Sequence, residues 1–395
     1  MATKQWLGSA AHVPQHDTID VSALAVGATA TFTINNKPIT YTRVAASDDP
    51  SIGLVGAIAA SSVAEAREVT ATVEGTLVNI RSANGRGIPY TIAGGANATH
   101  VNVTVATGPN FANEPANWTD GTLPVAGDDL VFDQGDTDCL YDLDAFAGVA
   151  FGSISVTDFI GSIGLPAWNV AGFAEYRPAF FQSDAVNVLV DSATVTRVKL
   201  DLGTSAAQVQ VVDSPVTEIP GVLLMGGAGA SELSVTAGSV GVGYRLTEVA
   251  TIGTVNLLGG TCECGAGATV GDVVNAGGAM ELLVDAASIN HSSGTTTIRG
   301  SAAVAQLRVA GGTVNYNSTG TLGGNTVVAG QGTLDFGGDL RAKTVTNPIE
   351  VFGSRAQLLD PHQVIASLEV DLNEAADLSR LNLGRNIRLT RGTPT

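Results

Sequence analysis

The 395-residue sequence is poor in aromatic side chains (5%) and in charged side chains (14%). Its formal net charge is −18, which argues against nucleic-acid binding because contacts to a phosphate backbone need clustered Lys and Arg. It contains no apolar run of about 18 residues that could span a membrane, and residues 1–20 lack the apolar stretch of a signal peptide. We therefore expect a protein made in the cytoplasm, with neither nucleic-acid nor membrane partners.

Cysteine is also scarce, with three residues in the whole chain, so complete pairing within one chain is impossible. Cys262 and Cys264 are two positions apart, and on a strand both side chains would point to the same side. The sequence offers no nearby histidine or further cysteine to complete a metal site. We expect both to be reduced packing residues.

Glycine, by contrast, is abundant at 48 residues, and together with many Ala, Val and Thr it is typical of an all-β protein with tight turns. Between Leu233 and Phe336 one motif recurs at unequal intervals: a glycine followed by a small residue comes five positions after an aliphatic one. The six pairs are Leu233/Gly238, Val255/Gly260, Val273/Gly278, Ile289/Gly294, Leu307/Gly312 and Val327/Gly332.

An alternating pair follows each of these glycines, which indicates one face of a strand. The pairs are Val240/Val242, Cys262/Cys264, Met280/Leu282, Thr296/Ile298, Val314/Tyr316 and Leu334/Phe336. A unit this small cannot bury its own apolar face, so neighbouring units must stack along an axis. The repeat predicts a single-chain parallel β-helix, or β-solenoid. The expected inward column, with members about 4.8 Å apart, is Val255, Val273, Ile289, Leu307 and Val327.

The pattern divides this mainly β chain into four parts. We expect an N-terminal arm over 1–20, a small α+β module over 21–107, a tryptophan-containing linker and solenoid cap over 108–150, and the solenoid over 151–395. Short strands near the C-terminus are interpreted as the last rungs.

The module is predicted to order its elements as hairpin, helix, hairpin. Alternating residues at Ala30–Ile34 and Ile39–Arg43 flank a turn, and Asp49 followed by Pro50 is typical of a helix start. Further strands are expected at Val69–Val73, Leu77–Arg81, Tyr90–Ala93 and Val101–Val105.

Two features of the linker leave alternatives open. Trp118 either closes the open end of the solenoid core or serves as a stacking platform for a sugar, and we favour the cap because exposed strand edges need cover. A run of carboxylates either holds calcium or forms a solvated acidic loop, which we favour. Its members are Asp128, Asp129, Asp133, Asp136, Asp138, Asp142 and Asp144.

Much of the aromatic content lies at Leu165–Asn169 and Glu175–Phe181. These segments form either a loop tucked on the solenoid or a contact with another subunit, which we favour slightly. Basic residues are concentrated near the C-terminus. They form either a solvated cap or a surface that pairs with acidic positions of a neighbouring copy. They are Arg380, Arg385, Arg388 and Arg391.

Catalytic motifs are missing from the sequence: it has no phosphate-binding loop, paired-histidine motif or nucleophile elbow. The histidines have no second ligand at metal spacing; they are His12, His16, His100, His291 and His362. For glycoside cleavage, the candidate carboxylate pairs are Glu281 with Asp285 and Asp335 with Asp339, but neither pair shares a predicted groove with other functional residues. We therefore expect that the protein is not an enzyme and that it has no catalytic residue, no cofactor and no metal site.

Two regions, the small module and the linker after it, carry a resemblance to known families. The flagellar hook IN motif, and small modules of tailed-phage structural proteins, are similar to TFTINNKPITYT and VTATVEGTLVNIRS at residues 31–42 and 69–82. Segments that precede β-solenoids in phage virion proteins and autotransporter-like passenger domains resemble NWTDG and GDDLVFD at 117–121 and 127–133. Together with MATKQWLGSAAHVPQ and the solenoid, these pieces resemble structural proteins of tailed phages.

That resemblance implies a virion protein, first of all a head decoration or cement protein that binds the major capsid protein and oligomerises, commonly as a trimer. In that setting we expect residues 1–20 to bind the capsid through Trp6. The alternatives are a tail fibre or spike that binds a host surface glycan through Trp168–Phe181, and an enzyme that cleaves such a glycan.

Overall fold

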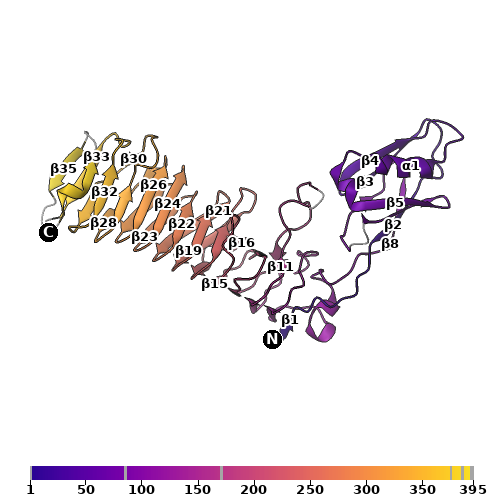
Figure 1. The fold of residues 1–395 in the computed structure, drawn as a ribbon, viewed down its shortest axis with the longest axis horizontal. Coiled ribbons are helices and arrows are strands. Elements are labelled where there is room, and N and C mark those ends of the chain that lie inside the picture. The colour runs from indigo at the N-terminus through magenta and orange to yellow at the C-terminus, as the bar shows by residue number, and fades with distance from the viewer. Residues whose placement is uncertain (1, 84–86, 170–171, 374–375, 384–386, 392–395) are drawn as a thin grey trace.

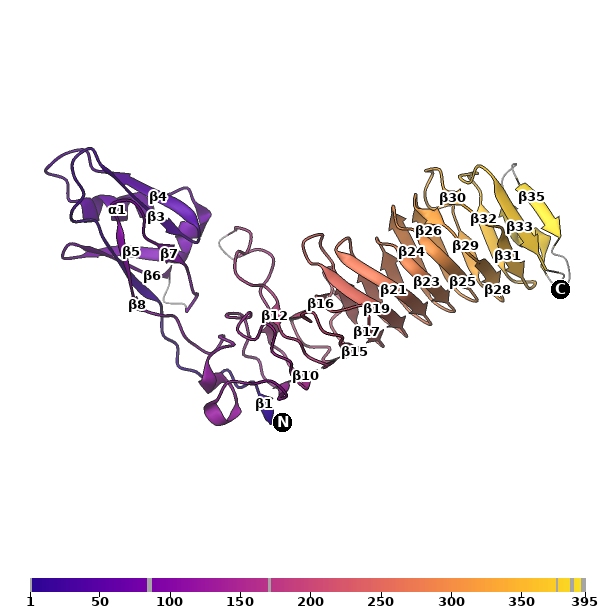
Figure 2. The same cartoon turned by 180° about the vertical axis from the view of Figure 1, so that it is seen from behind.

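The computed structural model describes residues 2–83, 87–169, 172–373, 376–383 and 387–391. Figure 1 shows a long β-rod that carries a small module beside its N-terminal end, and Figure 2 shows the same arrangement from behind. Helix accounts for only 7% of the structure, and the rod is a parallel β-solenoid of about 12 turns. The predicted fold class is confirmed.

Two parallel sheets form the rod, one of 16 strands and one of 12. The larger follows the order β1 (Thr3–Gln5), β9 (Asp129–Asp133), β10 (Ser153–Thr157), β13 (Asn187–Asp191), β15 (Gln208–Asp213), β17 (Glu232–Val235), β19 (Ala250–Leu257), β21 (Ala268–Asn275), β23 (Ala286–His291), β25 (Val304–Val309), β28 (Thr326–Ala329), β31 (Ile349–Phe352), β33 (Leu368–Leu372) and β35 (Ile387–Arg391), with β27 (Thr321–Leu322) and β30 (Thr344–Val345) beside it.

The smaller sheet follows the same axis on the other side of the core. Its strands are β11 (Ser162–Ile163), β14 (Arg197–Asp201), β16 (Val222–Met225), β18 (Ser239–Val242), β20 (Thr261–Cys264), β22 (Ala279–Leu282), β24 (Thr295–Gly300), β26 (Thr313–Ser318), β29 (Thr333–Asp335), β32 (Gln357–Asp360) and β34 (Leu381–Leu383), with β12 (Phe181–Gln182) paired to β14. Each repeat unit therefore contributes one strand to each sheet.

The predicted inward column is confirmed for most of its length. Val255 pairs with Val273, Val273 with Ile289 and Ile289 with Leu307, and all four are buried. The alternating residues after the glycines are buried as well, Cys262 and Cys264 among them as free thiols. These side chains belong to one continuous core.

Val327 is the exception, and its placement in the column is wrong. Leu307 pairs with Thr326, while Val327 pairs with the outward Arg308 and is only partly buried. The physical reason is one additional residue, Gln331, at the corner between Gly330 and Gly332. Because side chains alternate along a strand, a shift of one position exchanges the inward and outward sets. Gly330, with φ +62°, takes the left-handed conformation in this turn.

The module packs two small sheets against α1 (Pro50–Ala59) around its own core. One sheet has the order β5 (Val69–Glu74), β6 (Leu77–Ser82), β2 (His16–Asp20), β8 (Thr99–Thr104); the other is β4 (Lys37–Thr42), β3 (Thr29–Ile34), β7 (Ile92–Ala93). The predicted hairpin is confirmed, with Asn35 and Asn36 both at positive φ in its turn. Asp49 caps the helix through the amide of Ser51, as predicted.

Short 3₁₀ helices complete the described elements. They are η1 (Ala64–Glu68), η3 (Pro115–Asn117), η4 (Thr119–Gly121) and η5 (Leu378–Arg380). In the described part of the chain, no helix is both long and apolar enough to cross a bilayer.

Residues 2–20 do not form the separate arm that the sequence suggested. Strand β1 pairs with β9 in the rod, whereas β2 is an inner strand of the module, between β6 and β8. The chain thus begins in the rod, leaves it to form the module and returns to it at β9. The module is an insertion between β1 and β9, the first two neighbouring strands of the rod's larger sheet.

An aromatic cluster closes the N-terminal end of the rod's core. Trp118 is 1% exposed and its ring lies edge-on to that of Trp6, 5.1 Å away, with Phe132 and Phe146 also in contact. Its indole N–H donates to the carbonyl of Ala112, which completes its burial. The cap interpretation of Trp118 is confirmed, and its burial excludes the stacking platform.

Two substitutions at neighbouring positions of β25 test which side chains of the repeat point into the core. Leu307→Asp places a carboxylate in the apolar core, so we expect a loss of several kcal/mol in the free energy of unfolding and a markedly lower Tm. Gln306→Asp puts the same charge on the adjacent exposed position and should change Tm little. Thermal denaturation measures both; equal Tm values would contradict the assigned faces.

Candidate functional site

The junction between the module and the rod is the most elaborate polar site in the described chain. Two segments cross it, one leading from Trp6 to β2 and the other returning after β8. They are joined midway by Val13 and Thr107, whose backbone groups exchange hydrogen bonds of 2.9 and 3.1 Å. This two-stranded connection alone leaves the module free to bend or twist about it.

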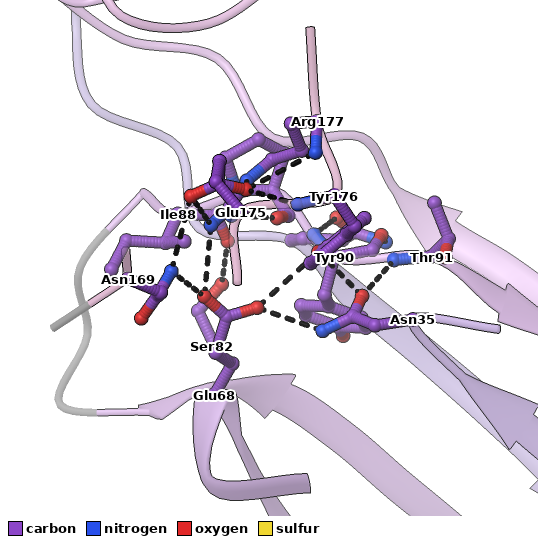
Figure 3. A network of polar contacts seen from close by, with 12 residues as sticks. Asn35, Glu68, Ser82, Ile88, Tyr90, Thr91, Asn169, Glu175, Tyr176 and Arg177 are labelled. Carbon is purple, nitrogen blue, oxygen red and sulfur yellow. Dashed lines mark hydrogen bonds and ion pairs between the residues drawn. The ribbon is translucent and has the colours of Figure 1, made fainter. Parts of the chain in front are cut away.

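A third contact comes from the loop between β11 and β12, which rises from the rod toward the module in both views (Figures 1 and 2). The contact centres on Glu68, a buried residue at the end of η1. One oxygen of Glu68 accepts hydrogen bonds from Asn169 at 2.7 Å and from Arg177 at 3.0 Å. The other accepts from Asn35 at 2.7 Å (Figure 3).

Arg177 is the rod's main contribution to this site. Its Nε lies 2.7 Å from Glu175 Oε1, and its second terminal nitrogen donates to the carbonyl of Pro89 in the module. The guanidinium also lies over the ring of Tyr176, 4.8 Å from the centroid. The side chains of Arg177, Glu175 and Glu68 are 10%, 3% and 3% exposed, so this is a buried ion network.

The turn of the module's first hairpin supplies the remaining partner. Asn35 adopts a left-handed conformation there, with φ +51°, and its side-chain oxygen accepts hydrogen bonds from the hydroxyl of Tyr176 and the amide of Thr91. Asparagine tolerates this conformation better than most residues. The turn residue that forms the hairpin thus also contacts the rod.

Electrostatics keep Glu175 and Arg177 charged at neutral pH. Burial acts to raise the pKa of Glu175, but the hydrogen bond and charge of Arg177 outweigh it and the pKa falls below the ordinary value. Burial opposes the charge of Arg177 as well, yet its carboxylate partners raise the pKa of the guanidinium. We call this set (Asn35, Glu68, Asn169, Glu175, Tyr176 and Arg177) the joint.

Beside the joint lies a cavity of about 640 Å³. Arg177, Glu175 and Asn169 form one side, while His12, Tyr141 and Arg197 contribute from the linker and the rod. This volume is within the range of small-molecule sites. The polar groups of the joint are already hydrogen-bonded to one another, so they leave few free donors and acceptors for a ligand here.

The structure separates the aromatic residues that the sequence placed together. Tyr176 belongs to the joint, while Phe180 and Phe181 are buried. Only Trp168 is prominently exposed, at 65%. The expected subunit contact is therefore corrected for Tyr176 and the two phenylalanines, because their neighbours lie within the same chain.

The acidic run of the linker is not gathered around a common centre. Asp128 accepts hydrogen bonds from the backbone amides of Ala2 and Val125, and Asp138 from that of Ser162. Among the residues that the structure describes, no group of three His, Cys, Asp or Glu side chains could hold a metal ion.

The candidate glycosidase carboxylates are each engaged locally. Glu281 pairs with Arg299 at 3.0 Å and Asp285 accepts from the amide of Ala303. Asp335 accepts from the amide of Gly337, and Asp339 pairs with two basic neighbours, Arg341 and Lys343. These contacts are those of turn and strand residues.

The histidines are dispersed over the module and the rod. His100 pairs with Asp17 at 2.7 Å, His16 with Asn79, and buried His291 with Thr296.

Comparison with protein families and with curated proteins identifies no relative of this chain. No protein-family model matches the chain, and no curated protein matches its sequence.

Removing the cation of the joint tests its role. Arg177→Met leaves Glu68 and Glu175 buried without a counter-charge, so we expect unfolding to become easier by about 3–5 kcal/mol at neutral pH. Arg299→Met, which breaks an ion pair whose arginine is 56% exposed, serves as the control and should cost less than about 1 kcal/mol.

The difference in unfolding free energy between Arg177→Met and the wild type should change with pH in a defined direction. The lowered pKa of Glu175 means that its contribution to wild-type stability is present at neutral pH and is lost as the pH falls through that pKa. In Arg177→Met, acid protonates buried Glu175 and removes its uncompensated charge, so the difference in unfolding free energy between variant and wild type becomes smaller as the pH falls. Denaturant titrations at several pH values measure it; a gap independent of pH would show that lost packing, rather than charge, causes the effect.

Proposed function

We propose that this protein is a structural component of a tailed-phage virion, in the first place a capsid decoration or cement protein that binds the head shell. The observation that carries the proposal is the joint: a buried ion network fixes a compact module to a long rod. Such a construction suits a protein that presents one part at a set angle to the part that is anchored. The resemblance of the module's sequence to assembly modules of phage structural proteins supports the same proposal.

Attachment through Trp6 is not compatible with the fold. Its ring is 3% exposed in the rod's aromatic cluster, and its indole N–H donates to the carbonyl of Thr137. A residue that is buried in its own core is not available to a capsid. Of the basic C-terminal candidates, Arg385 lies outside the described residues, and Arg388 and Arg391 are in β35.

The module offers a better surface on β8, an edge strand of its four-stranded sheet. Val101, Val103 and Val105 lie on and directly after this strand and are 55%, 52% and 68% exposed. Edge strands with exposed apolar residues are normally covered or blocked, because they pair readily with other chains. We propose that this valine strip contacts the capsid.

The alternative function, a tail fibre or spike that binds a surface glycan, rests on Trp168. This exposed tryptophan belongs to the loop between β11 and β12 and directly precedes Asn169 of the joint.

Introducing negative charge into the valine strip tests the proposed attachment. The double substitution Val101→Glu/Val103→Glu should reduce occupancy on capsids at least tenfold with an unchanged Tm, because both positions are exposed. The matched control, Thr70→Glu/Thr72→Glu, adds the same charge to exposed positions of β5 at the opposite edge of the sheet. Electron microscopy of virions carrying labelled protein gives both position and occupancy; full occupancy of the valine variant, or label on the tail, would contradict the proposal.

A further inference from the structure

A second cavity, of about 350 Å³, lies on the outer side of the smaller sheet near its N-terminal end. Three of the residues around it are basic, Arg197, Lys199 and Arg245, in a chain with 19 basic and 37 acidic residues. The wall between them is made by Pro166, Ala167, Thr196, Thr217 and Glu218, among others. A local excess of cations on a strongly acidic protein indicates an anion site.

Lys199 is the unusual member of this set. It lies on β14 between Val198 and Leu200, which point into the core, so its own side chain points outward. The loop between β11 and β12 nevertheless covers it: the residue is 4% exposed, and its ammonium lies 4.9 Å from the centroid of the Phe180 ring. Within the described chain, this ammonium donates no hydrogen bond and has no carboxylate at ion-pair distance.

The charges around Lys199 do not neutralise it. Burial lowers the pKa of its ammonium to about 8, with Glu248 acting in the opposite direction and Arg197 and Arg245 in the same one. Glu248 is shared with Arg245, 4.0 Å away, and the more distant Glu175 belongs to the joint. At neutral pH Lys199 thus remains largely protonated, with a side chain that is mostly buried and, within the described chain, no carboxylate at ion-pair distance.

Arg197 adds a second donor on the same strand. It is partly buried, and its Nε donates to the carbonyl of Gly164 at 3.2 Å, which leaves its terminal nitrogens for another acceptor. A planar guanidinium suits a carboxylate better than a point charge does, because it can donate two parallel hydrogen bonds. The pair Arg197 and Lys199 therefore suits an anionic oxygen group such as a carboxylate.

We propose that this cavity binds the carboxylate of an acidic saccharide. Lys199 and Arg197 take the carboxylate, while Glu218 and the hydroxyl oxygens of Thr196 and Thr217 accept hydrogen bonds from sugar hydroxyls. Trp168 follows the cavity-lining Pro166 and Ala167 directly in the chain and presents an exposed ring on which a sugar can stack. The cavity volume is within the range of small-molecule sites. This site does not depend on the virion assignment, and a decoration protein or a fibre could carry it.

Calorimetric titration with tetragalacturonate tests the site, with maltotetraose as the neutral probe and acetate as the simple anion. The full-length wild type should bind tetragalacturonate and not maltotetraose, and should bind acetate at least tenfold more weakly. Lys199→Met and Trp168→Ala should each weaken binding at least tenfold. Lys37→Met changes an exposed lysine on the module and should leave the affinity unchanged.

Two further measurements distinguish a binding role of Lys199 from a structural one. Lys199→Met removes a buried charge whose pKa is lowered in the fold, so this variant should be at least as stable as the wild type. Binding by the wild type should weaken as the pH rises through about 8, where Lys199 loses its proton, and this loss should be absent from Lys199→Met. No binding of tetragalacturonate, equal affinity in Lys199→Met and Lys37→Met, or acetate binding as tight as that of the oligosaccharide would overturn the proposal.

Discussion

Most of this structure depends on the stacking of parallel rungs. Because each turn pairs only with its neighbours, the two ends of a solenoid expose its core and unpaired backbone groups unless something covers them. At the N-terminal end β1 pairs with β9 and places Trp6 against Trp118. Residues 3–6 therefore belong to the rod, although the module follows them in the chain. The cap of the rod is a consequence of this requirement.

We infer that the joint gives the module a defined position relative to the rod. Two crossing segments give it a connection, and the hydrogen bonds of Glu68 and Arg177 add a third point that removes the remaining freedom. Buried ion pairs contribute little net stability compared with apolar packing, because both charges lose their hydration. We infer that this network is kept for the orientation that it specifies.

Local patterns predicted the parts of the fold that depend on local sequence. The glycine-marked repeat identified the rungs, and Trp118 identified the cap. The same logic failed at Val327, where one additional corner residue, Gln331, reversed the strand faces. It also failed for Trp6, whose size indicated burial but not that its partner would be Trp118, far along the chain.

The joint could not be predicted because its members are distant in sequence and ordinary in type. Glu68 and Arg177 are 109 positions apart, and each is a single charged residue in a segment without a motif. Asn35 was visible only as a turn residue. The unpaired Lys199 was likewise hidden, since its burial results from a loop that folds over the strand's outer face.

The central claim, that the joint holds module and rod as one rigid body, is tested most directly by a distance distribution between the two parts. Spin labels at Thr72→Cys in the module and Asn290→Cys in the rod lie at exposed positions, and the native Cys139, Cys262 and Cys264 are buried. Double electron–electron resonance should give a single narrow distribution. A broad or multi-peaked distribution in the otherwise unaltered protein would contradict the account.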